Sequence, residues 1–157
     1  PEAVSEILSG CRARTERPFV AKLAPNDPDL GNTVRVATEA GADALTLVNT
    51  VPGILLHARD GTPELGAGQG GMSGPALRPV GLRAVGIASA ATVLPIVGVG
   101  GVFAPTDAVA YARAGASLVE IGTASFAAPR AAEKVVRGLS RWGRPSDRWD
   151  DLRAPPK

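Results

Sequence analysis

Short apolar runs alternate along the chain with longer segments whose apolar residues recur at helical spacing. The runs at 18–23, 44–48, 95–98 and 118–121 have the length and composition of buried strands. The helical spacing occupies the segments 29–40, 75–91, 106–114 and 129–142. Strands that alternate with helices in this way pair in parallel through right-handed crossovers. The pattern therefore predicts an α/β chain of four βα units.

One connection is much longer than the others. The predicted strands begin about 25, 51 and 23 residues apart, and the extra length lies in a segment rich in glycine and proline, 51–73. Loops this long without structure of their own are usually functional, as active-site lids are. We therefore predict an unstructured, functional insertion over 51–73. Past residue 142 the apolar periodicity ends, and we predict a loosely held C-terminal tail over 143–157.

Four βα units are half of a (β/α)8 TIM barrel, which takes about 250 residues when complete. An open, doubly wound sheet is the alternative for a four-stranded core. The barrel is favoured because polar residues and glycines follow the carboxyl ends of the strands, where barrels build their sites. We expect residues 1–142 to form the C-terminal four units of such a barrel. The opening Pro1-Glu2-Ala3-Val4 resembles a helix already under way and suggests a longer protein.

Composition removes several classes of function. The chain has 157 residues, 45% of them hydrophobic and 20% charged, which suits one domain. The net charge is +2, with positive and negative residues interleaved, so we expect no nucleic-acid surface. We expect no membrane helix either, because charges interrupt every apolar stretch. The single Cys11 and single His57 argue against an internal disulfide and a metal site and suggest a cytoplasmic setting.

Glycines at two neighbouring strand ends suggest an anion site. Gly100 and Gly101 follow the third predicted strand, and Gly122 and Thr123 follow the fourth. Glycine lets backbone N–H groups approach an anion closely, and threonine adds a hydroxyl. The alternative is a tight turn between strand and helix. The pairing of the two strand ends favours phosphate binding.

Polar side chains accompany the first two strands. Lys22 lies near the end of the first strand, where it is either solvated or able to neutralise a negative ligand. Asn49 and Thr50 follow the second strand and either serve a turn or orient a polar heterocycle. Neither a nucleophile–base pair nor a pair of carboxylates stands at one strand end. The chain therefore offers groups that hold ligands without an evident general base.

Several distinctive motifs follow one another along the chain. They are Ala-Lys-Leu-Ala-Pro-Asn at 21–26, Leu-Val-Asn-Thr at 47–50, Gly-Gly-Met-Ser-Gly-Pro-Ala at 70–76, Ile-Val-Gly-Val-Gly-Gly-Val at 96–102, and Ala-Gly-Ala-Ser at 114–117 followed by Ile-Gly-Thr-Ala at 121–124. In this order they resemble the motifs of the class 1 dihydroorotate dehydrogenases. The resemblance covers about residues 1–142. The length of the insertion and the residues around Asn49 are most similar to those of the NAD-linked branch of class 1. Fumarate is the alternative final electron acceptor.

The resemblance implies an FMN-containing TIM barrel that oxidises dihydroorotate to orotate in pyrimidine biosynthesis. It implies FMN contacts at Lys22, Val48, Gly74, Gly100, Gly101, Gly122 and Thr123. It implies orotate contacts at Asn49 and Thr50. The family's general base is a cysteine that we expect before residue 1, so no catalytic residue is assigned and the chain alone should lack turnover. Expected partners are a second subunit in a homodimer and an electron-transfer subunit that carries FAD and an iron–sulfur cluster and uses NAD.

Two other functions fit the same residues. The first is a flavoprotein resembling the barrel of dihydropyrimidine dehydrogenase, which would act on dihydrouracil. The second is a non-catalytic half-barrel that binds FMN or phosphate.

Overall fold

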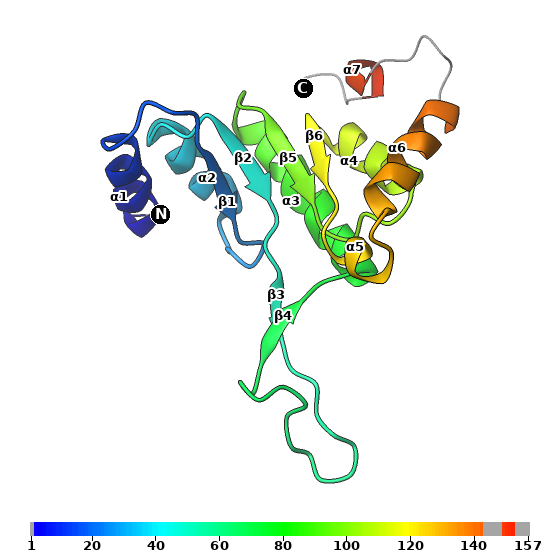
Figure 1. The fold of residues 1–157 in the computed structure, drawn as a ribbon. Helices are drawn as coiled ribbons and strands as arrows, with labels where there is room; N and C mark the ends of the chain where they lie inside the picture. Colours follow the sequence, from blue (N-terminus) through cyan, green and yellow to red (C-terminus); the bar gives the residue numbers. More distant parts are fainter. Residues whose placement is uncertain (1, 143–148, 153–157) are drawn as a thin grey trace.

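The computed structural model describes residues 2–142 and 149–152 (Figure 1). The helices are α1 (Glu2–Arg12), α2 (Leu30–Glu39), the 3-10 helix η1 (Pro75–Leu77), α3 (Arg78–Ala91), α4 (Pro105–Ala114), α5 (Thr123–Ala127), α6 (Ala131–Trp142) and α7 (Trp149–Leu152). The strands are β1 (Val20–Leu23), β2 (Ala44–Leu47), β3 (Val51–Gly53), β4 (Gly70–Met72), β5 (Ile96–Val99) and β6 (Leu118–Glu120).

The four predicted strands form one parallel sheet in the order β1-β2-β5-β6. Lys22 aligns with Thr46, which aligns with Val97, and Val97 aligns with Leu118. Each parallel neighbour is reached through a helix, namely α2, α3 or α4. The prediction of parallel βα units is confirmed. The described residues leave this sheet open, and its closure into a barrel stays a prediction.

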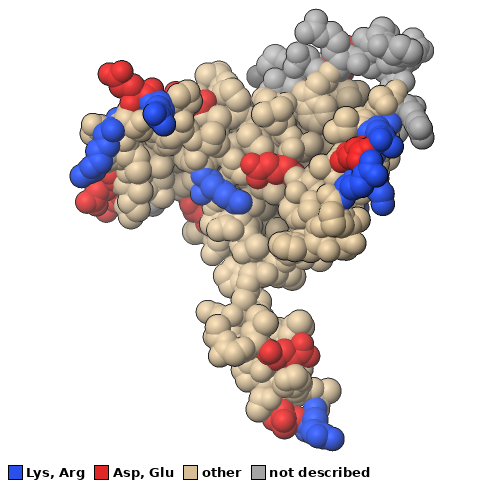
Figure 2. Space-filling view, in the orientation of Figure 1, with Lys and Arg blue, Asp and Glu red and all other residues tan. Residues whose placement is uncertain are grey.

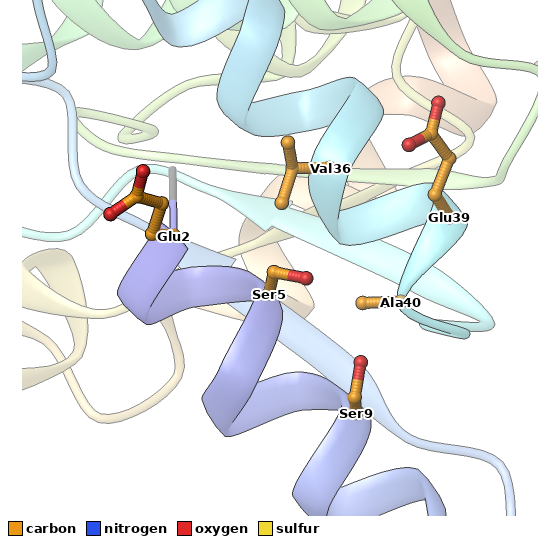
Figure 3. Close-up of a pocket in the computed structure, with 6 residues that line it drawn as sticks. All are labelled: Glu2, Ser5, Ser9, Val36, Glu39 and Ala40. Atoms are coloured by element: carbon orange, nitrogen blue, oxygen red, sulfur yellow. The ribbon is translucent and has the colours of Figure 1, made fainter.

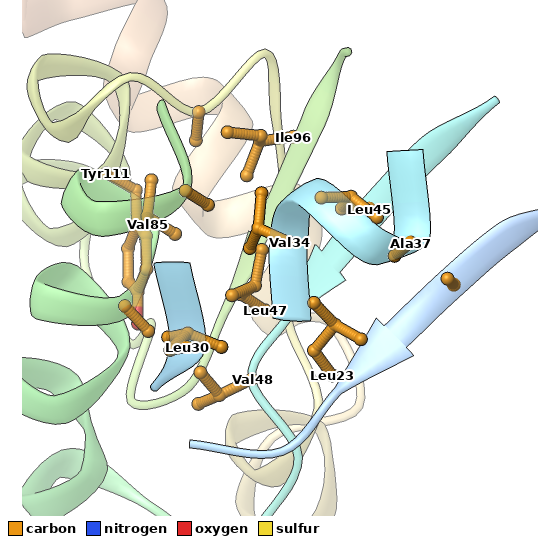
Figure 4. Packing of buried hydrophobic residues seen from close by; sticks show 14 of the residues in the cluster. Leu23, Leu30, Val34, Ala37, Leu45, Leu47, Val48, Val85, Ile96 and Tyr111 are labelled. Carbon is orange, nitrogen blue, oxygen red and sulfur yellow. The ribbon is translucent and has the colours of Figure 1, made fainter. Parts of the chain in front are cut away.

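The core lies between this sheet and the helices on one of its faces (Figures 1 and 4). Leu45 and Leu47 of β2 are wholly buried, and Val34 of α2 and Val85 of α3 meet them from the helix layer. Burial of each such aliphatic side chain contributes about 1.5–3 kcal/mol. Successive strand residues point to opposite faces, so these apolar positions fix which face receives the helices.

No described helix lies across the opposite face of the sheet (Figure 1). At its margins Val20 of β1 is 51% exposed and Leu118 of β6 is 64% exposed. Lys22 and Glu120 on the same two strands are also exposed. Charged side chains gather at the sides of the molecule and are sparse over this face (Figure 2). A parallel sheet is normally covered on both faces, so one covering layer is missing from the described residues.

The prediction that 51–73 lacks structure is wrong at its base. Strands β3 and β4 pair in antiparallel fashion, with Val51 opposite Met72 and Gly53 opposite Gly70. We call residues 51–72 the arm, because they project from the carboxyl end of β2, away from the sheet (Figure 1). Glycine-rich segments have low strand propensity, which is why the local pattern did not indicate the pairing.

Part of the predicted tail is also ordered. Residues 149–152 form α7, and the Trp149 Nε1 donates a hydrogen bond to the Ala116 carbonyl oxygen at 3.2 Å. The prediction of a loosely held tail is therefore wrong for residues 149–152. The rest of the predicted tail, 143–148 and 153–157, lies outside the described residues. Among the described helices, none is both long and apolar enough to cross a membrane.

Candidate ligand site at the carboxyl edge of the sheet

Every candidate group named from the sequence lies at or near one edge of the sheet. Lys22 is the third residue of β1, and Asn49 and Thr50 follow β2 directly. Gly100 and Gly101 follow β5, and Gly122 and Thr123 follow β6. Because the strands are parallel, their carboxyl ends meet at the same edge. The structure therefore places these residues at the common edge that the sequence predicted.

Three of the predicted contacts converge between β5, β6 and the start of η1. Gly74 precedes η1, is buried, and has a φ of 90°. A Cβ at Gly101 would lie 2.9 Å from the Gly74 carbonyl oxygen and 2.8 Å from the Arg78 backbone nitrogen. A Cβ at Gly74 would lie 3.9 Å from the Thr123 Cγ2. We call Gly74, Gly101 and Thr123, with Gly100 and Gly122 beside them, the glycine cradle. Gly101 approaches the Gly74–Arg78 backbone so closely that a side chain would not fit between them.

Tyr111 holds the strand end that carries this cradle. Its side chain is fully buried under β5, and its hydroxyl donates to the carbonyl oxygens of Val99 at 3.2 Å and Gly100 at 2.7 Å. Burial raises the pKa of Tyr111 to about 12, so the hydroxyl keeps its proton and remains a donor. The end of β5 is thus fixed from the helix side by a side chain of α4.

Asp107 fixes the segment that follows the cradle. Its carboxylate is buried and accepts hydrogen bonds from the Phe103 and Ala104 N–H groups, both at 2.9 Å. The same carboxylate forms an ion pair with Arg78, the first residue of α3. Arg78 also borders Gly101. The pair therefore ties together the two chain segments on either side of the cradle.

Replacing Asp107 with asparagine should change how stability depends on pH. Burial raises the pKa of Asp107, but the Phe103 and Ala104 N–H donors and Arg78 outweigh it and lower the pKa below its ordinary 3.8. The folded state therefore gains stability above the unfolded pKa and loses it as the pH falls toward the folded pKa. Urea unfolding measured between about pH 6 and pH 3 should show that the free energy of unfolding falls more steeply with decreasing pH in the parent than in Asp107→Asn. Parallel profiles would contradict this assignment.

Asn49 and Thr50, directly after β2, line a pocket of about 420 Å³ at the carboxyl edge of the sheet. The other walls come from Ala24 and Asn26 after β1 and from Pro52, Gln69, Gly70 and Gly71 at the base of the arm. The Asn49 backbone N–H donates to the Leu23 carbonyl at 3.1 Å, which fixes the pocket floor to the strands. Amide and hydroxyl groups of Asn26, Asn49, Thr50 and Gln69 give this pocket donors and acceptors for a polar ligand.

Lys22 and Val48 do not line this pocket. The Lys22 side chain is exposed on the uncovered face of the sheet and does not line the pocket. Val48 is buried, follows a cis peptide bond, and donates its N–H to the Val99 carbonyl at 3.1 Å. The structure thus brings together Gly74, Gly101 and Thr123, and separately Asn49 and Thr50. No described contact joins Lys22 to either group.

Sequence reasoning missed the side chains that support the cradle. Asp107 carried a usable signal, because an acid three residues into a helix that begins with proline often accepts hydrogen bonds from the preceding N–H groups. Arg78 and Tyr111 carried none, since their partners lie 29 and 11 residues away. The room for the Tyr111 ring depends on Gly81 and Gly98, whose missing side chains leave it space.

A second depression of about 260 Å³ lies between α1 and α2 (Figure 3). Its lining residues are Glu2, Ser5, Ser9, Val36, Glu39 and Ala40. It is on the helix side of the sheet and contains none of the residues predicted to bind a ligand. Across residues 2–142 and 149–152, no group of three or more His, Cys, Asp or Glu side chains is placed to hold a metal ion.

Comparison with known proteins identifies relatives that are named dihydroorotate dehydrogenases. The family model described as dihydroorotate dehydrogenase matches residues 1–142. The catalytic subunit of dihydroorotate dehydrogenase B (NAD(+)) from Pelobacter propionicus is 40% identical over 142 residues. The protein of the same name from Trichlorobacter lovleyi is 38% identical over 142 residues. A protein from Solibacter usitatus with the provisional name dihydroorotate dehydrogenase A (fumarate) is 42% identical over 142 residues.

Each of these alignments covers 90% of this chain and 47% of the relative. The chain therefore spans about half the length of the curated relatives it matches.

Proposed function

The chain belongs to the dihydroorotate dehydrogenase family, and on that premise we propose that its carboxyl edge binds FMN and orotate for the oxidation of dihydroorotate. The observation that carries the proposal is that Gly74, Gly101 and Thr123 converge at the same carboxyl edge of the sheet at which Asn49 and Thr50 line a pocket. In this proposal residues 1–142 supply the C-terminal half of a (β/α)8 barrel.

The cradle has the chemistry of a site for the FMN phosphate. Gly100, Gly101, Gly122 and Thr123 offer backbone N–H groups and one hydroxyl at two neighbouring strand ends. A Cβ at Gly101 would collide with the Gly74 carbonyl oxygen and the Arg78 backbone nitrogen, so the close approach of these two segments depends on glycine. Gly74 and the Val48 backbone are assigned to the flavin itself. When bound, FMN supplies an acceptor for the hydride of dihydroorotate.

The residues of this chain then have separate tasks. Asn49 and Thr50 hold the substrate ring through an amide and a hydroxyl, in a pocket whose outer wall is the base of the arm. Lys22 supplies a positive charge to the flavin ring from β1. Tyr111 and Asp107 touch neither ligand in this proposal. They keep the cradle in position through the Gly100 carbonyl and the Phe103 and Ala104 N–H groups.

The relatives support a partner that removes electrons. Two of those named above are catalytic subunits of NAD(+)-dependent enzymes, which supports a separate electron-transfer subunit for this protein. The third carries a fumarate name. We assign NAD as the final acceptor, through a subunit carrying FAD and an iron–sulfur cluster, since the residues around Asn49 are most similar to that branch.

Titration with FMN and with riboflavin tests the proposal on the purified chain. FMN should bind with quenching of flavin fluorescence, and riboflavin, which lacks the phosphate, should bind at least tenfold more weakly, about 1.4 kcal/mol. Lys22→Gln should weaken both flavins by a similar factor, because Lys22 is assigned to the ring. Absence of FMN binding, or equal affinity for the two flavins, would contradict the cradle assignment.

A further inference from the structure

The base of the arm packs against the Thr50 side chain through Gly71. This glycine is the middle residue of β4 and pairs with Pro52 of β3. A Cβ at Gly71 would lie 2.2 Å from the Thr50 Oγ1, 2.7 Å from the Thr50 Cβ and 3.2 Å from the Thr50 Cγ2. The Thr50 side chain therefore occupies the space that a side chain at position 71 would need.

Position 71 requires a glycine for space and not for backbone conformation. The φ of Gly71 lies outside the left-handed region, so an alanine could adopt the same backbone conformation. The pairing of β3 with β4 on both sides of Gly71 holds this residue in register. Since a slip of one residue would turn the other face of β4 toward Thr50, the register decides which residue meets it. The close contact between Gly71 and Thr50 is thus fixed by backbone pairing.

Steric contact sets the direction of the Thr50 hydroxyl. A single torsion moves the heavy atoms of a threonine side chain, and the branched Cβ restricts that torsion to a few positions. Among residues 2–142 and 149–152, the Thr50 Oγ1 has no hydrogen-bond partner that would choose between these positions. Thr50 is exposed and lines the pocket, so a ligand can reach its hydroxyl. The backbone at Gly71 therefore determines where a ligand finds this oxygen.

The Thr50 backbone in turn orients the Asn49 side chain. The Thr50 N–H donates a hydrogen bond to the Asn49 Oδ1 at 2.9 Å. This bond engages the amide oxygen within the chain and gives the Nδ2 group the role of donor to a ligand. Because Asn49 and Thr50 are consecutive and joined by this bond, a displacement of Thr50 changes both polar groups on this wall of the pocket.

We propose that Gly71 is a positioning residue for the substrate, because its missing side chain lets the base of the arm hold the Thr50 hydroxyl in the direction that binds the orotate ring. The inference rests on the proposed function, since it takes the pocket of Asn49 and Thr50 as the substrate site. Gly71 acts through Thr50 and lies in the arm, outside the glycine cradle. A change at Gly71 therefore affects orotate and leaves FMN binding unchanged.

Gly71→Ala tests this role in the purified chain. The added Cβ forces the Thr50 side chain to turn or the arm to move away, so orotate should bind about tenfold more weakly or worse, through loss of a hydrogen bond. The affinity for FMN should stay within about twofold of the parent's. Calorimetric titration of the FMN-loaded chain with orotate measures the first affinity, and flavin fluorescence measures the second. The Thr50 methyl NMR signal, identified by its loss in Thr50→Ser, should shift in Gly71→Ala without any ligand.

Gly53→Ala is the matched control in the same pair of strands. A Cβ at Gly53 would lie 3.6 Å from the Met72 Cβ, an ordinary contact. This variant should leave the Thr50 methyl signal and both affinities unchanged. If the parent binds orotate and Gly71→Ala binds it equally well, the positioning role is overturned and the proposed function is not. If the parent binds FMN but no orotate, the proposed substrate site is wrong, and the inference is overturned with it.

A comparison of stabilities separates the contact from folding in general. Thr50→Gly removes the three atoms that a Cβ at position 71 would meet. In urea unfolding, Gly71→Ala should therefore lower the free energy of unfolding in the parent more than in Thr50→Gly, as expected for residues in contact. Equal losses in the two backgrounds would overturn the inference, because Gly71 would then not be in contact with Thr50.

Discussion

Gly101→Ala is expected to weaken FMN binding at least tenfold and to lower the free energy of unfolding by about 2–4 kcal/mol. Gly101 is buried and has a φ of 69°, a conformation that costs an alanine energy. The added Cβ would also lie 2.8 Å from the Arg78 backbone nitrogen and 2.9 Å from the Gly74 carbonyl oxygen. Backbone atoms cannot rotate away as a side chain can, so the cradle must open. Urea unfolding and flavin titration measure the two effects separately.

Gly66→Ala is the control for that substitution. Gly66 lies in the arm, a Cβ there would meet no atom within 4 Å, and its φ is not in the left-handed region. The free energy of unfolding of Gly66→Ala should stay within about 0.5 kcal/mol of the parent's. If Gly101→Ala is as stable as Gly66→Ala, the close approach of Gly101 to the Gly74–Arg78 segment is wrong, whether or not either protein binds flavin.

The second large effect is expected at Gly81 in α3. A Cβ at this position would overlap the Tyr111 hydroxyl and lie 3.0 Å from the Val99 carbonyl oxygen. Tyr111 is fully buried and its hydroxyl is bound to Val99 and Gly100, so it has no free space to enter. Gly81→Ala should therefore destabilise the protein by roughly 1–3 kcal/mol despite the better helix propensity of alanine. Thermal and urea unfolding measure this loss.

Gly86→Ala makes the same change one and a half turns further along the same helix. A Cβ at Gly86 would meet no atom within 4 Å. Alanine should therefore stabilise α3 there by about 0.5–1 kcal/mol, since glycine is the poorer helix former. The change in the free energy of unfolding should thus have opposite signs in the two variants. Equal effects would show that Tyr111 does not occupy the space next to Gly81.

The sequence was sufficient for the features that depend on local pattern. The apolar runs located all four strands of the main sheet to within two residues, because each is a short apolar run bounded by glycine, proline or polar residues. Their parallel pairing followed from the helices between them. The common edge for Lys22, Asn49, Gly100 and Gly122 followed in turn, since parallel strands place their carboxyl ends together.

Features that depend on distant partners could not be predicted in this way. The β3–β4 pair joins residues about 20 positions apart through a glycine-rich segment with little strand propensity. The support of the cradle by Tyr111 depends on glycines at 81 and 98 in two other elements. The short α7 is held by the contact of Trp149 with Ala116, 33 residues earlier. Each of these is decided by tertiary contact.

The arm has a consequence for the motion of the molecule. Ile54, Leu55 and Leu56 are each more than half exposed, so most of the arm beyond its base is stabilised by few buried contacts and has a low cost of local opening. Its base nevertheless supplies Pro52, Gln69, Gly70 and Gly71 to the ligand pocket. A ligand that contacts this wall restricts the arm and loses part of its binding energy to that ordering. Affinity and the flexibility of the arm are therefore thermodynamically linked.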